Sequence, residues 1–517
     1  MWYYPRGLLS GGAQTCVGKG GRADLSNDRY GCDMHTGSLR IVARFLSSDQ
    51  IRSAIRLPTR LTATMLRIVV VGGGIAGLSA GIALRRAGHI VNIYEQSDMK
   101  HEVGAAINVP PNASRFLTSW GLDPKLSRFV KARALAWCDP FTANAKETMS
   151  YEERAAKSGG AELWLAHRVD LHNALKHIAT DPAGPGIPVT VHPGSRVVGY
   201  EPRAPSITLA SGEVIEGDVV IGADGVHSLA SETVLGYENR PVAPSHYNYC
   251  YRFLIPVSKL QADPETRSWN ADIDGKTRVF ADNENRRRLV AYACRDNTIY
   301  NFVGLFYDEA STYSAKREDY LASVDKAEVM ERFAGYHPSI LAVINKATDI
   351  MRWPLLYRPP TPVWRKDRLV LVGDAAHPML PHQAQAGAQA MEDGVALGIV
   401  LRGVSTPEEV EERLELYQKI RRNRASAIQI LSNVGADQSH LVYEDLKEFL
   451  AEEDIPTNPS EITDFNFGYD VVAASLEAVH QLTETAAPRP NRGVNNAAAD
   501  HDASNLADSS QCTTVVH

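Results

Sequence analysis

The hydrophobic positions near residue 70 predict a strand, a helix and a second strand in close succession. Residues 68–71 form an unbroken β-branched run, Ile-Val-Val-Val, which is typical of a strand buried on both faces. The stretch from Leu78 to Arg86 is rich in Ala and Leu and indicates a helix, and residues 91–95 form the next apolar run. This order predicts a βαβ unit.

Two later apolar runs repeat the buried-strand pattern. Residues 218–222 and 368–372 are dominated by Val, Ile and Leu, and each run leads into a short motif that contains Gly and Asp. Helical periodicity follows at residues 385–402 and 407–434. We interpret the basic stretch 421–424 as complementing the dipole of the second helix. Strands that alternate with helices predict an α/β fold with a parallel sheet.

Shorter segments with clear boundaries lie between these units. Asn112 is expected to cap a short amphipathic helix that Gly121 ends. Residues 163–171 run from a strand into a helix that is expected to begin near Asp170, and residues 187–216 predict a β-meander.

Three alternating segments in the middle of the chain predict an antiparallel sheet. In the first of them, residues 247–256, Tyr249, Tyr251 and Phe253 share one face, while Arg252 points the opposite way. Apolar alternation of this kind is typical of a sheet with two different faces. The other two strands are expected at residues 288–293 and 300–307.

Composition places the chain among globular proteins. It has 517 residues, of which 44% are hydrophobic and 22% charged, and its net charge of −7 gives no reason to expect a nucleic acid partner. No apolar run reaches the ~18 residues of a membrane span. The six cysteines are scattered without a C-x-x-C pair, which argues against a metal site or a disulfide framework and suits a reducing compartment.

The turn after the first strand carries a dinucleotide-binding pattern. Gly72 permits a tight turn, Gly74 lets the backbone approach a pyrophosphate, and Gly77 lets the helix pack close to the sheet. Glu95 lies 18 residues beyond Gly77 at a strand end, where its carboxylate can accept hydrogen bonds from a ribose diol. The four residues predict a dinucleotide site, and they do not separate NAD from FAD.

Two aspartates are expected at the same edge of the sheet. Asp224 and Asp374 each follow a buried strand, and open α/β sheets hold their ligands at the carboxyl ends of their strands. Either side chain alone could be a helix cap. Two such strand ends in a chain that begins with the glycine turn favour ribose or ribityl binding.

Two further positions are weaker candidates for cofactor contact. Ala105 belongs to a run of small residues before a helix, which could either pass close to a flat ligand or simply connect two elements. Arg168 lies at a junction of strand and helix, where its guanidinium could reach a pyrophosphate or a flavin edge, or form a surface ion pair.

Three motifs together resemble a known family. Residues 72–77 (GGGIAG), 223–228 (ADGVHS) and 373–378 (GDAAHP) resemble, in order and spacing, the fingerprints of the single-component FAD-dependent aromatic hydroxylases. The likeness is strongest to the salicylate hydroxylase-like branch, including its biosynthetic members in secondary metabolism. It covers about residues 65–428 and is specific for cofactor and reaction class, but not for substrate.

The chain departs from the family pattern at two places. Ser231 stands where the second motif usually has Arg, which is expected to weaken communication between the nicotinamide and flavin sites. Ala384 and Ala386 stand where the third motif usually has glycines, so the fit or mobility of the flavin is expected to differ. Gly387 is the glycine that remains in this turn and is carried over as a cofactor-binding position.

The resemblance implies a discontinuous FAD-binding Rossmann-like domain of the GR2 type, interleaved with an antiparallel-sheet substrate domain and followed by C-terminal helices. The expected order is an extension at 1–64, FAD-binding segments at 65–240 and 357–440, the substrate domain at 241–356, a helical segment at 441–485 and a disordered tail at 486–517. The extension is expected to lie outside the fold. Mitochondrial targeting is the weaker alternative to a cytoplasmic location.

The resemblance also implies a reaction. FAD is reduced by transiently bound NADPH or NADH, O₂ adds at C4a, and the hydroperoxyflavin passes an OH equivalent to a phenolic or salicylate-like ring. Some members of the family use residues that match Arg252 and Tyr292 to hold a phenolate, which makes these two the candidate catalytic residues. The alternative is that Arg252 is a solvated side chain and Tyr292 a core residue without a catalytic role.

Other functions stay open at this point. The chain has one G-x-G-x-x-G and no C-x-x-C, which argues against disulfide reductases and Baeyer–Villiger enzymes. An epoxidase or oxidative dearomatase acting on a larger metabolite is one alternative, and a flavin-dependent reductase or non-catalytic flavoprotein is another. The expected partners are a small aromatic substrate and O₂, and the chain is expected to be a monomer or a homodimer.

Overall fold

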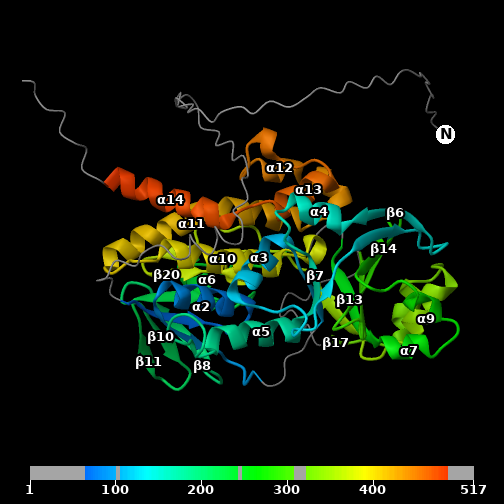
Figure 1. Ribbon diagram of the computed structural model, residues 1–517, viewed down its shortest axis with the longest axis horizontal. Coiled ribbons are helices and arrows are strands. Elements are labelled where there is room, and N and C mark those ends of the chain that lie inside the picture. Colours follow the sequence, from blue (N-terminus) through cyan, green and yellow to red (C-terminus); the bar gives the residue numbers. More distant parts are fainter. Residues whose placement is uncertain (1–64, 100–104, 243–246, 308–321, 487–517) are drawn as a thin grey trace, which may run out of the picture. The chain divides into compact units, whose positions relative to one another are not determined.

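A computed structural model describes residues 65–99, 105–242, 247–307 and 322–486 (Figure 1). The expectation of an N-terminal extension outside the fold concerns residues that lie outside this range, as does that of a tail beyond residue 486. Both stay predictions.

A six-stranded sheet contains the expected βαβ unit at its centre. The strand order is β19 (Arg365–Lys366), β20 (Leu369–Leu371), β12 (Val219–Gly222), β1 (Arg67–Val71), β2 (Ile90–Tyr94) and β8 (Thr190–His192). Neighbouring strands are parallel, except that β19 runs antiparallel to β20. β12 and β20 are buried throughout and β1 from its second residue, which explains their unbroken apolar sequences.

Helices pack against this sheet. α2 (Ile75–Ala87) contacts both α5 (Arg168–Thr180) and α10 (Ala386–Val400), and α3 (Pro111–Trp120) also contacts α10 (Figure 1). Glycine lets α2 and α10 approach closely, because a Cβ at Gly398 would lie 2.8 Å from that of Ala83. The helix that follows the third sequence motif, α10, therefore packs directly against α2, the helix that follows the glycine turn.

One expected helix cap is wrong, because the cap of α3 is Pro110 and not Asn112, whose side chain turns inward instead. α5 begins at Arg168, directly after β7 (Trp164–His167) and two residues before Asp170, so the predicted junction of strand and helix is confirmed. Gly121 does end α3, in the left-handed conformation that glycine favours. Of the expected meander, β8 joins the parallel sheet. A separate three-stranded sheet is formed by β9 (Val197–Glu201), β10 (Ser206–Leu209) and β11 (Val214–Glu216).

The second large sheet has eight strands. Their order is β17 (Ala322–Ser323), β18 (Met351–Pro354), β13 (Tyr249–Pro256), β16 (Ile299–Phe306), β15 (Arg287–Cys294), β14 (Lys276–Asp282), β5 (Ala134–Cys138) and β6 (Ala145–Ser150). The pairings are antiparallel, except that β14 and β5 are parallel. The three predicted strands are its central ones, β13, β15 and β16. β5 and β6 come from a part of the chain before residue 241.

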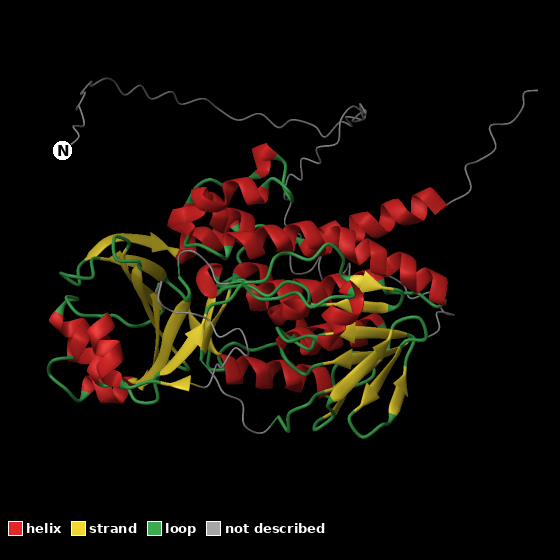
Figure 2. Ribbon diagram, turned by 180° about the vertical axis from the view of Figure 1, so that it is seen from behind, coloured by secondary structure: helices red, strands yellow, loops and turns green. Residues whose placement is uncertain are grey.

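The two faces of this sheet differ, as the alternation predicts. Tyr249, Tyr251 and Phe253 pack into a core with α7 (Val257–Gln261), α8 (Lys326–Arg332) and α9 (Pro338–Asn345), helices that lie on one face in Figure 2. The opposite face carries Arg252 and packs toward the nucleotide-binding elements. There Tyr292 shares a buried cluster with Ala106 and Leu165, which come from the small sheet of β3 (Ala106–Val109), β7 (Trp164–His167) and β4 (Val130–Lys131).

The last helices pack onto the nucleotide-binding elements. α11 (Pro407–Leu431) and α14 (Val471–Ala486) both contact α10, while α12 (Tyr443–Leu446) and α13 (Pro459–Phe467) lie between them in the chain. α11 begins with a capping box between Thr406 and Glu409. Within the described residues, none of the helices combines the length and apolar character needed to cross a membrane.

Candidate active site

The turn between β1 and α2 admits only glycine at two positions and leaves a third open. Gly72 has φ +105°, and a Cβ there would lie 2.2 Å from the carbonyl oxygen of Ala223. A Cβ at Gly77 would lie 1.9 Å from the Gly72 oxygen, whereas one at Gly74 would meet no protein atom within 4 Å. A phosphate can therefore approach the backbone at Gly74, in front of the N-terminus of α2.

Glu95 follows β2 and holds this turn through its carboxylate. Oε2 accepts a hydrogen bond of 2.7 Å from the Gly73 N–H, and Oε1 accepts one of 2.7 Å from the Ser97 N–H. A carboxylate has about four acceptor positions, so two remain for a ribose diol. The half-buried side chain thus lies beside the glycine turn, at the position that the sequence predicts.

Asp224 follows β12 and organises the turn that the second motif forms. Its carboxylate accepts hydrogen bonds from the Tyr200 hydroxyl (2.8 Å), the Ala230 N–H (3.0 Å) and the Ser228 hydroxyl. Ser228 in turn caps α6 (Leu229–Leu235). Three protein donors leave one acceptor position on Asp224, so its chief contacts in this structure hold the turn in shape.

Asp374 is exposed to a cavity at the end of β20. The cavity, of about 100 Å³, is also lined by His227, Ser231 and Arg358. The protein around the carboxyl group is dense, so desolvation raises its pKa, and the charges of His377 and other cations nearby oppose the rise. A carboxyl group in this setting gains from a hydroxyl ligand that replaces the lost water.

Ala105 and Arg168 are hydrogen-bonded to each other where α5 begins. The Arg168 N–H donates to the Ala105 carbonyl at 2.9 Å. The charge of Arg168 opposes the rise in the pKa of Asp374 that burial causes, so the guanidinium acts on that carboxyl group. Arg168 therefore connects two positions that the sequence singled out separately.

The loop between β20 and α10 contains a strained residue. Ala384 has φ +54° and ψ +33°, a left-handed conformation that costs a non-glycine residue about 1–2 kcal/mol. The replacement of a family glycine by Ala384 therefore affects the backbone itself. Gly387 lies in the first turn of α10, where a Cβ would approach the Ile107 side chain to 3.2 Å.

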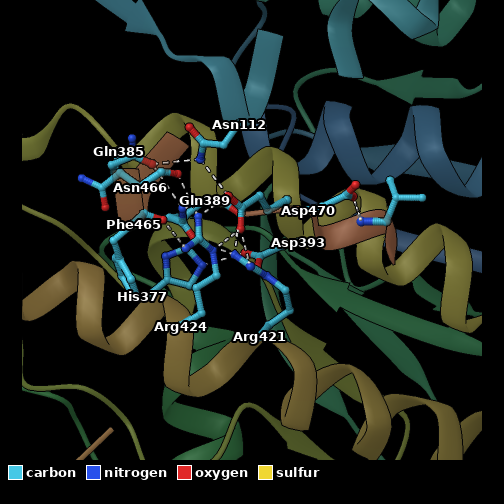
Figure 3. Close-up of polar contacts among 12 residues, drawn as sticks. Asn112, His377, Gln385, Gln389, Asp393, Arg421, Arg424, Phe465, Asn466 and Asp470 are labelled. Carbon is cyan, nitrogen blue, oxygen red and sulfur yellow. Dashed lines mark hydrogen bonds and ion pairs between the residues drawn. The ribbon is translucent and has the colours of Figure 1, made fainter. Parts of the chain in front are cut away.

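A buried polar network of Glu392, Asp393, Arg421 and Arg424 lies next to this loop (Figure 3). Glu392 and Asp393 of α10 are both fully buried, and each makes an ion pair with Arg421 of α11. Arg424, which is 7% exposed, pairs with Glu392 as well. The two carboxylates and two guanidinium groups balance in charge, which is the condition under which buried ions persist.

Asp393 connects the network to the third motif. Its Oδ2 accepts hydrogen bonds from the Gly373 N–H (2.9 Å) and from His377 Nε2 (2.6 Å), and its Oδ1 accepts one from Arg421 Nε (2.8 Å). Burial alone would raise the pKa of this carboxyl group, but the charges of His377 and Arg421 outweigh it and lower the pKa to about 2. The backbone that presents Asp374 is therefore tied to an ionised carboxylate.

Glu392 connects the network to two other segments. Its Oε1 accepts a hydrogen bond from Asn112 Nδ2 at 2.7 Å, which ties it to α3. Arg424, which donates to both Glu392 oxygens, also donates to the backbone carbonyls of Phe465 (3.0 Å) and Asn466 (3.0 Å). The C-terminal helices are therefore fixed to the same centre as the third motif.

The sequence did not predict this network. The interpretation of residues 421–424 as a complement to the helix dipole is wrong for Arg421 and Arg424, because both guanidinium groups are paired in the interior. A signal was present in α10, where Glu392 and Asp393 interrupt a helix otherwise rich in Ala, Gly, Val and Leu. Charged residues on a face that must be buried need partners.

Arg252 and Tyr292, the candidate catalytic residues, lie on one face of the eight-stranded sheet. Arg252 is opposite Val303, which is opposite Val290, and Tyr292 lies two residues further along the same strand. The guanidinium lies over the Trp353 ring at 4.6 Å. Burial raises the pKa of Tyr292, and the charge of Arg252 works against this, so the two side chains are close in space.

Arg252 has only one hydrogen bond to the described residues. Its Nη2 donates weakly to the Ala106 carbonyl at 3.4 Å, while its Nε is buried without a partner. Because no described carboxylate pairs with Arg252, its charge is available to an anionic ligand. Tyr292 keeps its proton at neutral pH and can act as a donor.

Sequence comparisons find nucleotide-cofactor families at both ends of the nucleotide-binding elements. Residues 310–431 match the FAD binding domain, and residues 70–117 match the NAD(P)-binding Rossmann-like domain. The chain is 48% identical over 414 residues to the FAD-dependent monooxygenase cfoG of Aspergillus candidus, covering 80% of this chain and 95% of that protein. It is 32% identical to the hispidin-3-hydroxylase of Neonothopanus nambi, covering 70% of this chain and 86% of that protein.

Solved structures with a similar fold include a salicylate hydroxylase in a substrate complex. This structure has a TM-score of 0.62 and 20% identity, and covers 81% of this chain and 99% of that one. The structure of FqzB has a TM-score of 0.63 and 25% identity, and covers 83% of this chain and 95% of that one. The interleaved architecture is thus the one seen in flavoprotein hydroxylases.

Proposed function

The chain belongs to the FAD-dependent monooxygenases, and from that premise we propose that it hydroxylates a phenolic or salicylate-like aromatic substrate with NADPH or NADH and O₂. The reaction consumes the ring, O₂, NAD(P)H and a proton, and yields the hydroxylated ring, water and NAD(P)⁺. FAD supplies the transfer of electrons from nicotinamide to O₂. The residues of the chain bind, orient and shield the reacting groups.

The residues of the nucleotide-binding elements fit FAD. The open backbone at Gly74 and the helix dipole of α2 suit the pyrophosphate, and the two remaining acceptor positions of Glu95 suit a ribose. Asp374, exposed to its cavity, suits a ribityl hydroxyl. Arg168, whose charge acts on Asp374, and its hydrogen-bond partner Ala105 complete the set, and we assign all five residues to the cofactor.

The observation that carries the choice of substrate is the half-buried cation of Arg252, whose Nε is buried without a partner. A phenol reacts with an electrophilic oxygen much better as its phenolate, and a buried phenolate needs a positive partner. Arg252 lies on the sheet face that packs toward the nucleotide-binding elements, with a buried donor atom unpartnered and no described carboxylate beside it. Tyr292, held protonated by burial, can donate a second hydrogen bond.

This assignment gives the second sheet a role. We propose that the segment 241–356 acts as the substrate domain and that strands β5 and β6 extend it. The buried, unpaired cysteines Cys138, Cys250 and Cys294 suit a reducing compartment, which supports a cytoplasmic location. Among relatives, one carries the name hispidin-3-hydroxylase, and another, 6-hydroxynicotinate 3-monooxygenase, carries a name that specifies a hydroxylated ring as substrate.

The test is a screen for substrate-stimulated NADPH oxidation by purified holoenzyme. Phenolic acids and larger phenols are added one at a time while NADPH absorbance and O₂ are followed, and NADH replaces NADPH in a parallel series. We expect at least one phenol to stimulate both signals and to gain one oxygen atom by mass. Ring ultraviolet absorption then distinguishes hydroxylation from dearomatisation. If no phenol stimulates O₂ uptake while NADPH reduces another acceptor, the proposal fails in favour of a reductase.

The variant Arg252→Met tests whether the charge of Arg252 is needed for turnover of a phenol. Met keeps most of the apolar stem over Trp353 and removes the charge, so we expect phenol-stimulated turnover to fall by at least tenfold while the ratio of flavin to protein is unchanged. The matched control is Arg286→Met. Arg286 lies in the turn before β15, and its guanidinium lies over the Tyr307 ring. Equal activity of Arg252→Met and the wild type would contradict the role of Arg252.

A further inference from the structure

Gly73, the middle residue of the turn between β1 and α2, has both of its backbone polar groups held by side chains. Its N–H donates to Glu95 Oε2 at 2.7 Å, and its carbonyl oxygen lies 2.7 Å from Nε2 of His172. Glu95 follows β2, whereas His172 belongs to α5. Two elements that are separate in the chain therefore fix the same residue of the turn.

The direction of the contact between His172 and Gly73 follows from the chemistry of the two groups. A carbonyl oxygen can only accept, so Nε2 of the imidazole carries a hydrogen and donates it. The distance of 2.7 Å is at the short end of the range for N–H···O bonds. The side chain of His172 is only 2% exposed, so water does not replace it. The imidazole thus holds the Gly73 carbonyl in one direction.

The Gly73 carbonyl belongs to the same peptide unit as the Gly74 N–H. A trans peptide is planar, and its C=O and N–H bonds point in opposite directions. Because His172 holds the carbonyl toward α5, the Gly74 N–H points away from α5. This N–H has no acceptor among the described residues, and no side chain caps the N-terminus of α2. A donor of fixed direction is therefore left at Gly74, where a Cβ would meet no protein atom within 4 Å.

Helix α5 has a second connection to the residues that we assign to FAD. Arg168 is its first residue and precedes His172 by four positions, so the two side chains lie on one face of the helix. The charge of Arg168 acts on Asp374, and His172 holds the glycine turn. The first two turns of α5 therefore act on two separate parts of the cofactor site.

We propose that His172 is a positioning residue for FAD. Its Nε2–H holds the peptide between Gly73 and Gly74 so that the Gly74 N–H donates to the pyrophosphate, while the imidazole itself does not touch the cofactor. If His172 only packs α5 against the turn, its loss lowers the stability of the protein and leaves its affinity for FAD unchanged. The proposal concerns binding of FAD and does not depend on the identity of the substrate.

The experiment compares two variants of His172 in the full-length protein. His172→Leu fills a similar volume without a donor, whereas in His172→Gln the amide nitrogen can take the place of Nε2. FAD is titrated into the FAD-depleted proteins, and its dissociation constant is measured from the change in flavin fluorescence. We expect the constant to rise about tenfold or more in His172→Leu, because a hydrogen bond to a charged group is misdirected. His172→Gln should recover most of the affinity.

Two further measurements separate positioning from packing. His177→Leu removes an exposed imidazole from the same helix and should leave the affinity for FAD unchanged. ADP, which has the pyrophosphate and lacks the flavin, is used as a competitor of FAD. Its affinity should fall in His172→Leu by the same factor as that of FAD. Thermal unfolding without FAD reports the loss of packing alone.

Three results would overturn the proposal. The first is a dissociation constant for FAD in His172→Leu equal to that of the wild type, whatever its Tm. The second is an equal loss of affinity in His172→Leu and His172→Gln, since the donor would then not matter. The third is an unchanged affinity for ADP in His172→Leu. If His172→Leu does not fold, His172→Gln is compared with His172→Asn, whose shorter side chain cannot reach Gly73, and equal affinities of these two for FAD would overturn the proposal.

Discussion

Removal of Arg421 should destabilise the protein strongly because its ion pairs are fully buried. The residue takes no part in the proposed chemistry. In the variant Arg421→Met, the apolar stem remains while the ion pairs to Glu392 and Asp393 and the 2.7 Å hydrogen bond to Gln389 Oε1 are lost. The network then carries two carboxylates against one guanidinium, Arg424. Asp393 then keeps His377 and the Gly373 N–H as partners but has no guanidinium beside it.

The magnitude follows from the burial of this network. Breaking a buried ion pair by removing one partner costs roughly 3–5 kcal/mol. The structure describes about 400 residues, and an unfolding entropy of about 2.1 cal/mol/K per residue converts this cost to a fall in Tm of about 4–6 °C. The loss of one exposed charge instead costs less than about 0.5 kcal/mol.

The assay is thermal unfolding of the FAD-saturated protein, followed by circular dichroism and by the fluorescence of released flavin. Lys419→Met is the control on the same helix, because its exposed ammonium group lies 3.9 Å from Glu415 and should shift Tm by less than about 1 °C. Arg421→Lys keeps the charge but lacks the several N–H donors of the guanidinium group, so its Tm should lie between those of Arg421→Met and Lys419→Met. A Tm of Arg421→Met within 1 °C of the wild type would refute the reasoning.

Three further predictions concern the third motif. Asp374→Ala should lower the ratio of flavin to protein after purification, and an unchanged ratio would show that Asp374 does not hold FAD. Ala384→Gly relieves the left-handed conformation but adds freedom to the unfolded chain, so a net gain of up to about 1 kcal/mol is expected in the holoenzyme; a lower Tm would contradict this. The Asp393 pKa of about 2 lies below its ordinary 3.8, so its contribution to stability is complete above about pH 4 and is lost as the pH falls toward 2. Tm should drop in that window, and the drop should be smaller in Asp393→Asn.

The sequence predicted those parts of the fold that depend on local pattern. The β-branched run at 68–71, the glycine turn and the central strands of the second sheet are confirmed, because burial on one or both faces dictates the residues of each segment directly. The short strands β17 and β18 were missed. So were β5 and β6, since which sheet they join depends on pairing with segments more than 100 residues away.

The candidate site could be predicted from the sequence only at positions where the backbone conformation itself demands a particular residue type. Gly72 and Gly77 are fixed by close approach, so their role is readable in the sequence. His172 and Glu392 are different, because their environment comes from partners distant in the chain. Glu392 lies 280 residues from Asn112, and His172 lies 99 residues from Gly73. No periodicity records such contacts.

The contact of Arg424 with Phe465 and Asn466 has a consequence for how the protein matures. The acids of α10 are synthesised well before Arg424, and Arg424 is synthesised about 40 residues before the carbonyls that it binds. At about 5–20 residues per second, the ribosome needs roughly 2–8 s to add those residues. During that interval the buried network of Glu392, Asp393, Arg421 and Arg424 lacks the two backbone carbonyls that accept hydrogen bonds from Arg424. The buried network that holds the third motif therefore cannot be complete until residue 466 has been made, even though the glycine turn at residues 72–77 is made early.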